Sequence, residues 1–132
     1  MAGAPLFLLR APGGVLPLLA ILVDRVEEAG ELVPVPGAPP AIAGITEVRS
    51  VVLTLLHPEG LPGWEATEPG PRRGPGLPRS VLRLTRPWRH LAIHVPAGSH
   101  LERATGPRRG VLTPRRLAAA LADLARPAES RP

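Results

Sequence analysis

A proline-rich segment in the first half of the chain limits its fold most strongly. Residues Leu32–Pro40 contain four prolines, and proline has no backbone N–H to donate to a β-ladder. The segment cannot be a central strand, so we expect it to run extended along a sheet edge and then turn. It separates the strand-like residues Val23–Val26 from the apolar run Val48–Leu56. The stretch Ala20–Leu56 therefore predicts two strands held in register by a stiff, donor-poor loop, on a surface suited to binding other proteins.

Composition favours one compact domain with stiff loops. A chain of 132 residues is long enough for one domain, and 44% hydrophobic residues can build a core. This apolar content argues against a fully disordered chain. The 19 prolines and 14 glycines together make up a quarter of the chain, which indicates long, proline-stiffened loops. We expect a single domain over residues 1–132.

The absence of cysteine excludes disulfides, thiolate zinc sites and thiol nucleophiles, and it fits a cytoplasmic protein. The net charge of +5 would suit a nucleic-acid partner. The arginine pairs at 72–73, 108–109 and 115–116 are scattered, however, and the chain has few aromatic side chains for stacking on bases. We therefore do not expect nucleic-acid binding.

The apolar N-terminal stretch Leu6–Val23 is interrupted by Arg10, two prolines and a Gly-Gly pair. A membrane-spanning helix needs about 20 largely uninterrupted apolar residues, so we expect no membrane insertion. Leu6–Leu9 reads as a buried strand ending at the Pro12–Gly14 turn. The following residues Val15–Val23 fit either a helix or the second strand of a hairpin, because periodicity alone does not decide between them.

The clearest strand pattern is Val48–Leu56, which is rich in β-branched residues and bounded by a His-Pro pair. Strand alternation places Arg49 at the start of an apolar face. We expect its stem to lie on the core and its guanidinium to emerge at a barrel end.

The second half reads as a loop, a hairpin and a helix. Pro58–Pro78 predicts an extended, poorly packed loop anchored by Trp64, which we expect to dock on the core. Ser80–Leu84 and His90–Val95 predict a second hairpin, whose later strand alternates Leu91, Ile93 and Val95 with outward-facing His90, Ala92 and His94.

Several independent signals predict a helix over Thr113–Arg126. Thr113 is a good N-cap and Pro114 stands at the first helical position. The side chains of Leu117, Leu121 and Leu124 form one apolar stripe. The helix should end before Pro127.

No catalytic or metal centre is predicted. His90 and His94 have a spacing that binds metal on a helix, but four residues along a strand span about 13 Å, too far for one ion to bridge. No serine lies in a nucleophile elbow, and no glycine-rich phosphate loop is present. The acidic residues Glu27, Glu28 and Glu31 indicate a solvated turn. We expect a protein that is not an enzyme and has no cofactor.

One stretch resembles a known family. Val23–Val26, Leu32–Pro40, Ala43–Ile45 and Val48-Arg49 follow one another in an order and spacing that resemble the CheW-like chemotaxis coupling domain. That family shows a Val-Asp-x-Val-x-Glu stretch, a Pro-x-Pro-Gly-x-Pro-like turn and a Gly-hydrophobic-x-Asn-x-Arg-Gly segment leading into a strand. The similarity covers about a third of the chain well and extends weakly through Val81–Val95 and the C-terminal element.

This resemblance implies a mainly β fold: two small, SH3-like five-stranded barrel lobes that share a core, with a short C-terminal helix. It favours a strand over Val15–Val23. It also implies a non-enzymatic adaptor that joins the regulatory domain of a CheA-type histidine kinase to a methyl-accepting chemoreceptor.

By the same resemblance, Arg49 falls on the family's characteristic partner-contacting arginine. Val33, Pro36 and Gly44 fall on positions that shape the same surface. Arg49, beside Glu47, would set the register of a partner through a charged hydrogen bond.

The chain departs from the family pattern at several positions. Glu47 stands in place of Asn, Ser50 of Gly, Thr54 of Pro and His57 of Asp, so the fold carries over better than the choice of partner. Two alternatives stay open. One is a basic small-barrel protein that binds nucleic acid, with strongly salt-dependent affinity, and the other is a structural subunit that only dimerises.

Overall fold

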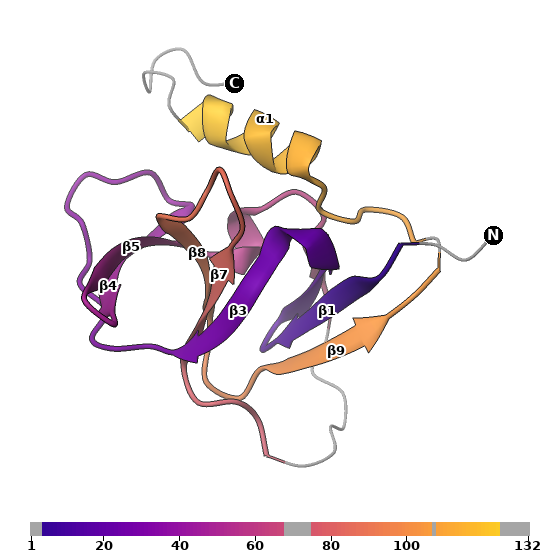
Figure 1. The fold of residues 1–132 in the computed structure, drawn as a ribbon, viewed down its shortest axis with the longest axis horizontal. Coiled ribbons are helices and arrows are strands. Elements are labelled where there is room, and N and C mark those ends of the chain that lie inside the picture. Colours follow the sequence, from indigo (N-terminus) through magenta and orange to yellow (C-terminus); the bar gives the residue numbers. More distant parts are fainter. Residues whose placement is uncertain (1–3, 68–74, 107, 125–132) are drawn as a thin grey trace.

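The computed structural model describes residues 4–67, 75–106 and 108–124. Over these residues the chain is mainly β, with two sheets and one short α-helix near the C-terminal end, which confirms the expected fold class (Figure 1). The strands of the first sheet are β1 (Leu6–Ala11), β2 (Gly14–Leu19), β6 (Glu65–Ala66) and β9 (His100–Ala104). Those of the second sheet are β3 (Val23–Glu28), β4 (Ile42–Val48), β5 (Val51–Leu56), β7 (Ser80–Leu84) and β8 (Leu91–Val95). The helical elements are the 3-10 turns η1 (Ala20–Leu22) and η2 (Pro58–Gly60) and the helix α1 (Pro114–Leu124).

The first sheet has the strand order β6-β2-β1-β9 and the second the order β3-β7-β8-β5-β4, within the described residues. All neighbours are antiparallel except β5 and β8, which run parallel. The β3 and β4 strands lie at opposite edges of the second sheet. The predicted direct register between the two strands that flank the proline-rich loop is therefore wrong, because the loop carries the chain from one edge of the sheet to the other.

The N-terminal residues form the hairpin that the turn signals predict. The β1 and β2 strands pair in continuous register. Leu6 lies opposite Leu19 at one end of the hairpin, and Ala11 lies opposite Gly14 next to the turn. The ambiguous stretch Val15–Val23 is strand through Leu19, as the resemblance implies, and then turns through η1 into β3.

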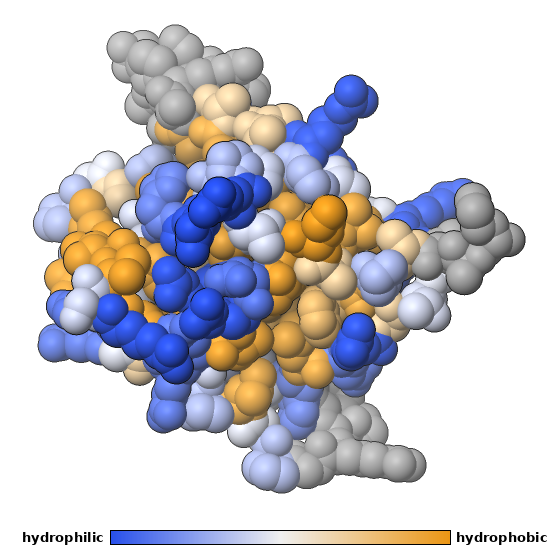
Figure 2. All heavy atoms as spheres, viewed as in Figure 1, coloured by the Kyte–Doolittle hydropathy of each residue, from blue (hydrophilic) through white to orange (hydrophobic). Residues whose placement is uncertain are grey.

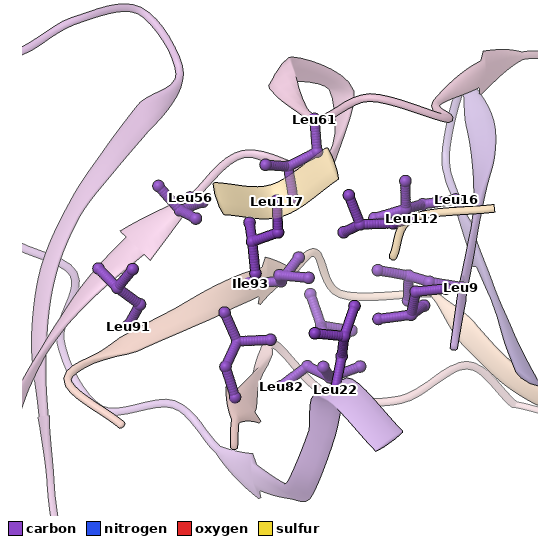
Figure 3. Close-up of a cluster of buried hydrophobic side chains, with 13 residues drawn as sticks. Leu9, Leu16, Leu22, Leu56, Leu61, Leu82, Leu91, Ile93, Leu112 and Leu117 are labelled. Atoms are coloured by element: carbon purple, nitrogen blue, oxygen red, sulfur yellow. The ribbon is translucent and has the colours of Figure 1, made fainter. Parts of the chain in front are cut away.

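Both sheets contribute to one large hydrophobic core. The side chains of β1 and β2 on one inner face meet those of β7 and β8 on the other, and α1 closes the space above them (Figure 3). This shared core contains Leu9, Leu16, Leu18, Leu22, Leu56, Leu61, Leu82, Leu84, Leu91, Ile93, Val95, Leu112 and Leu117. Burial of this much apolar surface is the main stabilising contribution to the fold.

A second, smaller core fills the interior of the five-stranded lobe. It consists of Val48, Leu53, Leu55, Val81 and Ala92. Because β8 presents Ile93 to the shared core and Ala92 to this one, the strand is covered on both faces. The predicted half-buried strand with an outward Ala92 face is therefore wrong. His94 is also half-buried, whereas His90 lies in the turn before β8 and is exposed.

The described part of Pro58–Pro78 has more regular structure than the predicted loop. It begins with η2, buries Leu61 and adds the short strand β6 to the edge of β2. Trp64 packs on the backbone of Gly14, where a Cβ atom would lie only 2.2 Å from the indole ring. The predicted docking of Trp64 is confirmed, and residues 68–74 of the predicted loop lie outside the described residues.

The α1 helix has the predicted cap and the predicted buried face. The Arg116 N–H donates to the Thr113 hydroxyl over 3.2 Å, and Leu117 is fully buried. Leu112, just before the cap, bonds through its backbone to Pro17 and Leu19 on β2. The last two residues of the predicted helix, 125–126, lie outside the described residues, as does Pro127. No helix in the described ranges combines the length and apolarity needed to cross a bilayer.

Candidate partner-binding site

The β4–β5 hairpin ends in a tight turn whose two central residues are Arg49 and Ser50. Val48 pairs with Val51 across the turn, and the φ angles of Arg49 and Ser50 are 50° and 66°. Two central residues with positive φ make a type I′ turn, which normally selects Asn and Gly. The prediction of one continuous strand from Val48 to Leu56, with the Arg49 stem on the core, is therefore wrong. The Arg49 side chain is 74% exposed at the hairpin tip.

The proline-rich arm, residues 29–41, crosses the outer edge of β4. Val33 and Ile45 exchange two backbone hydrogen bonds of 2.8 and 2.9 Å, and the neighbouring Pro34 has no N–H to extend the ladder. Gly44 permits this crossing, because a Cβ atom there would lie 2.5 Å from the Val33 carbonyl oxygen. The predicted extended course along a sheet edge is confirmed.

Beyond Val33 the arm turns back toward β4. The Ala38 N–H donates to the Val35 carbonyl over 3.2 Å. Pro36 and Gly37 are the two central residues of this turn, and Gly37 has a φ of 76°. Proline followed by a left-handed glycine is the signature of a type II turn, so the predicted turn is also confirmed.

Two open depressions adjoin each other at this end of the five-stranded lobe. The first, of about 280 Å³, lies on the outer face of the hairpin and is lined by Glu31, Val33, Ile45, Thr46, Glu47 and Val52. The second, of about 570 Å³, lies between β3 and the hairpin tip and is lined by Val26, Glu27, Glu28, Ala29, Gly30, Glu47, Val48 and Arg49. Glu47 belongs to both. In Figure 2, hydrophobic and charged side chains lie interleaved on the side of the molecule occupied by β3, β4 and β5.

Glu27 links β3 to the hairpin tip. Its Oε1 atom lies 3.4 Å from Arg25, 3.6 Å from Arg83 and 3.9 Å from Arg49. The carboxylate side chain is only 8% exposed, and its Oε2 atom is buried without a hydrogen-bond partner among the described residues. The prediction of a solvated acidic turn is wrong for Glu27 and Glu28, which lie in β3. The surrounding guanidinium groups offset the cost of burying the Glu27 charge.

The structure brings three of the five predicted site residues to this surface. Arg49, Glu47 and Val33 line the depressions. Gly44 is buried beneath the arm and supports Val33, whereas Pro36 is exposed at the arm's turn and lines neither depression.

Sequence reasoning missed other contributors to the surface. Glu31 and Ile45 line the first depression beside Val52, which is 60% exposed although it lies in a strand. The Val51-Val52 pair carried a signal for this, because alternation forces one of two adjacent strand residues outward.

The histidines do not form a metal centre of the kind considered from the sequence. The His94 ring packs edge-on against His57, with ring centroids 6.2 Å apart, and His57 lies 3.4 Å from Glu59. Among the described residues no group of three or more His, Asp or Glu is placed to hold a metal ion.

No protein-family model matches the chain, and the search of curated proteins found no relative. Among solved structures, the chain is similar to the crystal structure of the scaffolding protein TtCheW from Thermoanaerobacter tengcongensis, with a TM-score of 0.52 and 14% sequence identity. The fold is CheW-like. The match covers 76% of this chain and 61% of TtCheW. At this level of identity the similarity concerns the fold, and it agrees with the resemblance seen in the sequence.

Proposed function

We propose that this protein is a non-enzymatic, cytoplasmic adaptor in chemotaxis-type signal transduction. It would couple the regulatory domain of a CheA-type histidine kinase to methyl-accepting chemoreceptors. The observation that carries the proposal is a CheW-like fold in which Arg49, Glu47 and Val33 share one solvent-open surface. Function still resides in the site and not in the fold, so the chemistry of this surface must also suit the role.

The surface combines features of a protein-binding face. Two aliphatic side chains that line it, Val33 and Val52, are 47% and 60% exposed. Clustered exposed apolar groups mark sites of protein association. Arg49 adds a planar cation at the rim, which can bind a partner carboxylate through two parallel hydrogen bonds.

Arg49 is only loosely held in the free protein. Among the described residues its closest acidic partner is Glu27, whose Oε1 atom is 3.9 Å away, longer than a hydrogen bond between charged groups. A partner carboxylate would therefore have to replace only the weak contact between Arg49 and Glu27. This suits a residue that forms its main ion pair when a partner binds. Exposed aliphatic groups beside a weakly paired cation are features that favour docking of another protein.

A bridging assay tests the proposal. The regulatory domain of a CheA-type kinase and the cytoplasmic fragment of a chemoreceptor from the same genome are mixed with and without the purified chain. We expect the kinase domain to co-elute with the receptor fragment only when the chain is present. Failure of the chain to bind either protein would overturn the adaptor role. Salt-sensitive binding to DNA or RNA in its place would favour the nucleic-acid alternative.

A further inference from the structure

The outer face of the β4–β5 hairpin carries a depression that is open to solvent and has both aliphatic and acidic lining residues. Val33, Ile45 and Val52 provide its aliphatic lining. Val33 belongs to the proline-rich arm and pairs with β4 on one side. Val52 belongs to β5, on the other side of β4, and lies opposite Glu47 in the hairpin. The depression, of about 280 Å³, is large enough for one aliphatic side chain and too small for most complete ligands.

Two carboxylates edge this depression. Glu31 and Glu47 both line it and are exposed. Neither takes part in an ion pair within the part of the chain that the structure describes. The nearby Arg49 is directed to Glu27 on the other side of the hairpin tip. Both rim carboxylates are therefore available to pair with a partner cation, although the net charge of the chain is +5.

We propose that the depression binds an aliphatic side chain of a partner protein that is flanked by lysine or arginine. The aliphatic group would bury the exposed faces of Val33 and Val52, and the cationic group would pair with Glu31 or Glu47. Complementary charge of this kind sets orientation and speeds association more than it adds affinity. The inference rests on the proposed adaptor function, because it specifies the chemistry that one docking face of that adaptor selects.

The test uses the full chain, labelled with ¹⁵N, and two capped peptides as probes. One peptide has an isoleucine between two lysines, and its match has glutamates in place of the lysines. At low salt we expect the lysine peptide to shift the amide signals of Val33, Ile45 and Val52, with at least about threefold higher affinity than the glutamate peptide. Absence of a saturable shift at these amides, or equal affinity for the two peptides, would overturn the inference.

Matched variants separate this depression from general surface effects. Val52→Ser should weaken binding of the lysine peptide at least about threefold, whereas Val51→Ser alters an adjacent exposed valine that does not line the depression and should leave binding unchanged. Glu47→Gln should weaken binding, and Glu65→Gln, in β6 of the other sheet, should not. Equal losses in both members of a pair would contradict the proposal.

A dilution series without peptide tests whether a second copy of the chain occupies the depression. If the same amides shift with protein concentration, a second copy of the chain fills the depression and the inference is wrong. None of these readouts requires a kinase or a receptor, so their failure leaves the adaptor role standing. Conversely, a chain that binds the lysine peptide but bridges no signalling proteins would lose only the adaptor role.

Discussion

At the hairpin tip, two residues with side chains occupy backbone conformations that favour glycine. Arg49 and Ser50 both have positive φ angles, and each such residue costs on the order of 1 kcal/mol. The turn keeps Arg49 in solvent, where it adds nothing to the core. Strain that persists at an exposed position is characteristic of sites under functional constraint, which supports a partner-contacting role for this turn.

Replacing Ser50 by glycine should stabilise the fold. Ser50→Gly relieves the left-handed strain but increases the freedom of the unfolded chain, so the net gain should be about 0.5–1 kcal/mol. Urea unfolding followed by circular dichroism measures the change. If Ser50→Gly instead lowers stability, as a glycine substitution at an ordinary strand position does, the turn is not strained.

Gly44 should tolerate no side chain. Gly44→Ala places a Cβ atom 2.5 Å from the Val33 carbonyl oxygen at a φ of 150°, so both strain and steric overlap oppose it. We expect a loss of about 2–4 kcal/mol. Gly37→Ala is the matched control, because it has a positive φ but nothing within 4 Å of its Cβ. It should cost only about 1 kcal/mol. Equal losses of stability in Gly44→Ala and Gly37→Ala would mean that the arm can move aside to accommodate a side chain at Gly44.

His94 should make stability depend on pH. Burial lowers the pKa of His94 below its ordinary value of 6.5, His57 and Arg79 lower it further, and Glu59 opposes the shift. The unfolded chain therefore takes up this proton more readily than the folded chain. Stability should be full above pH 6.5 and should decline as the pH falls below 6.5 toward the lower pKa of the folded state.

Unfolding measured between pH 7.5 and 5 checks this dependence. His94→Phe removes the titrating group and should flatten the profile in that range. The same change at His90, which is exposed in the turn before β8, should leave the slope in place. An unchanged slope in His94→Phe would assign the pH dependence to other groups.

At the scale of elements, α1 is the part that local signals predict best. The cap at Thr113 and the buried Leu117 depend on residues within one or two turns of each other, and both are found as expected. Leu117→Ala should destabilise the protein by about 2–4 kcal/mol, because it leaves a cavity beneath the helix in the shared core.

Thermal unfolding measures this loss. Leu121→Ala, on the same face but only partly buried, is the control and should cost clearly less. A similar loss in the two variants would mean that the helix packs as a uniform stripe, without an anchor at Leu117.

The strands were harder to predict because their pairing depends on residues far apart in sequence. The parallel contact of β5 with β8 places β3 and β4 at opposite edges, and no local pattern specifies that order. The Arg49-Ser50 turn lacks the Asn-Gly signal of a type I′ turn, so the local pattern there predicts a continuous strand. Double burial of β8 likewise follows from its central position in the sheet, which alternation does not reveal.

The candidate site was predicted in part, and mainly through resemblance. Arg49, Glu47 and Val33 came from family-like motifs and do share a surface. Glu31 reaches the same surface only through the crossing of the arm over β4, a tertiary arrangement, whereas Val52 reaches it from β5, opposite Glu47 in the hairpin. Glu27 could not be recognised as a buried carboxylate, because its arginine partners come from β3, β7 and the hairpin tip.

At the scale of the whole molecule, the two sheets share one core while the candidate surface projects from the five-stranded lobe. The hairpin is anchored to the shared core through Leu56 of β5, and the arm packs on the smaller core through Ala29 and Leu32. Residues at the hairpin tip contribute little to that core. Binding and stability should therefore separate when Arg49 is changed.

Calorimetric titration of the chain with the regulatory domain of a CheA-type kinase tests this account most directly. Loss of a charged hydrogen bond at Arg49→Ala should weaken binding about tenfold or more and leave the melting temperature nearly unchanged. Arg115→Ala, at an exposed position of α1, should change neither quantity. A wild-type chain that does not bind, or an Arg49→Ala chain that loses stability and affinity together, would contradict the account.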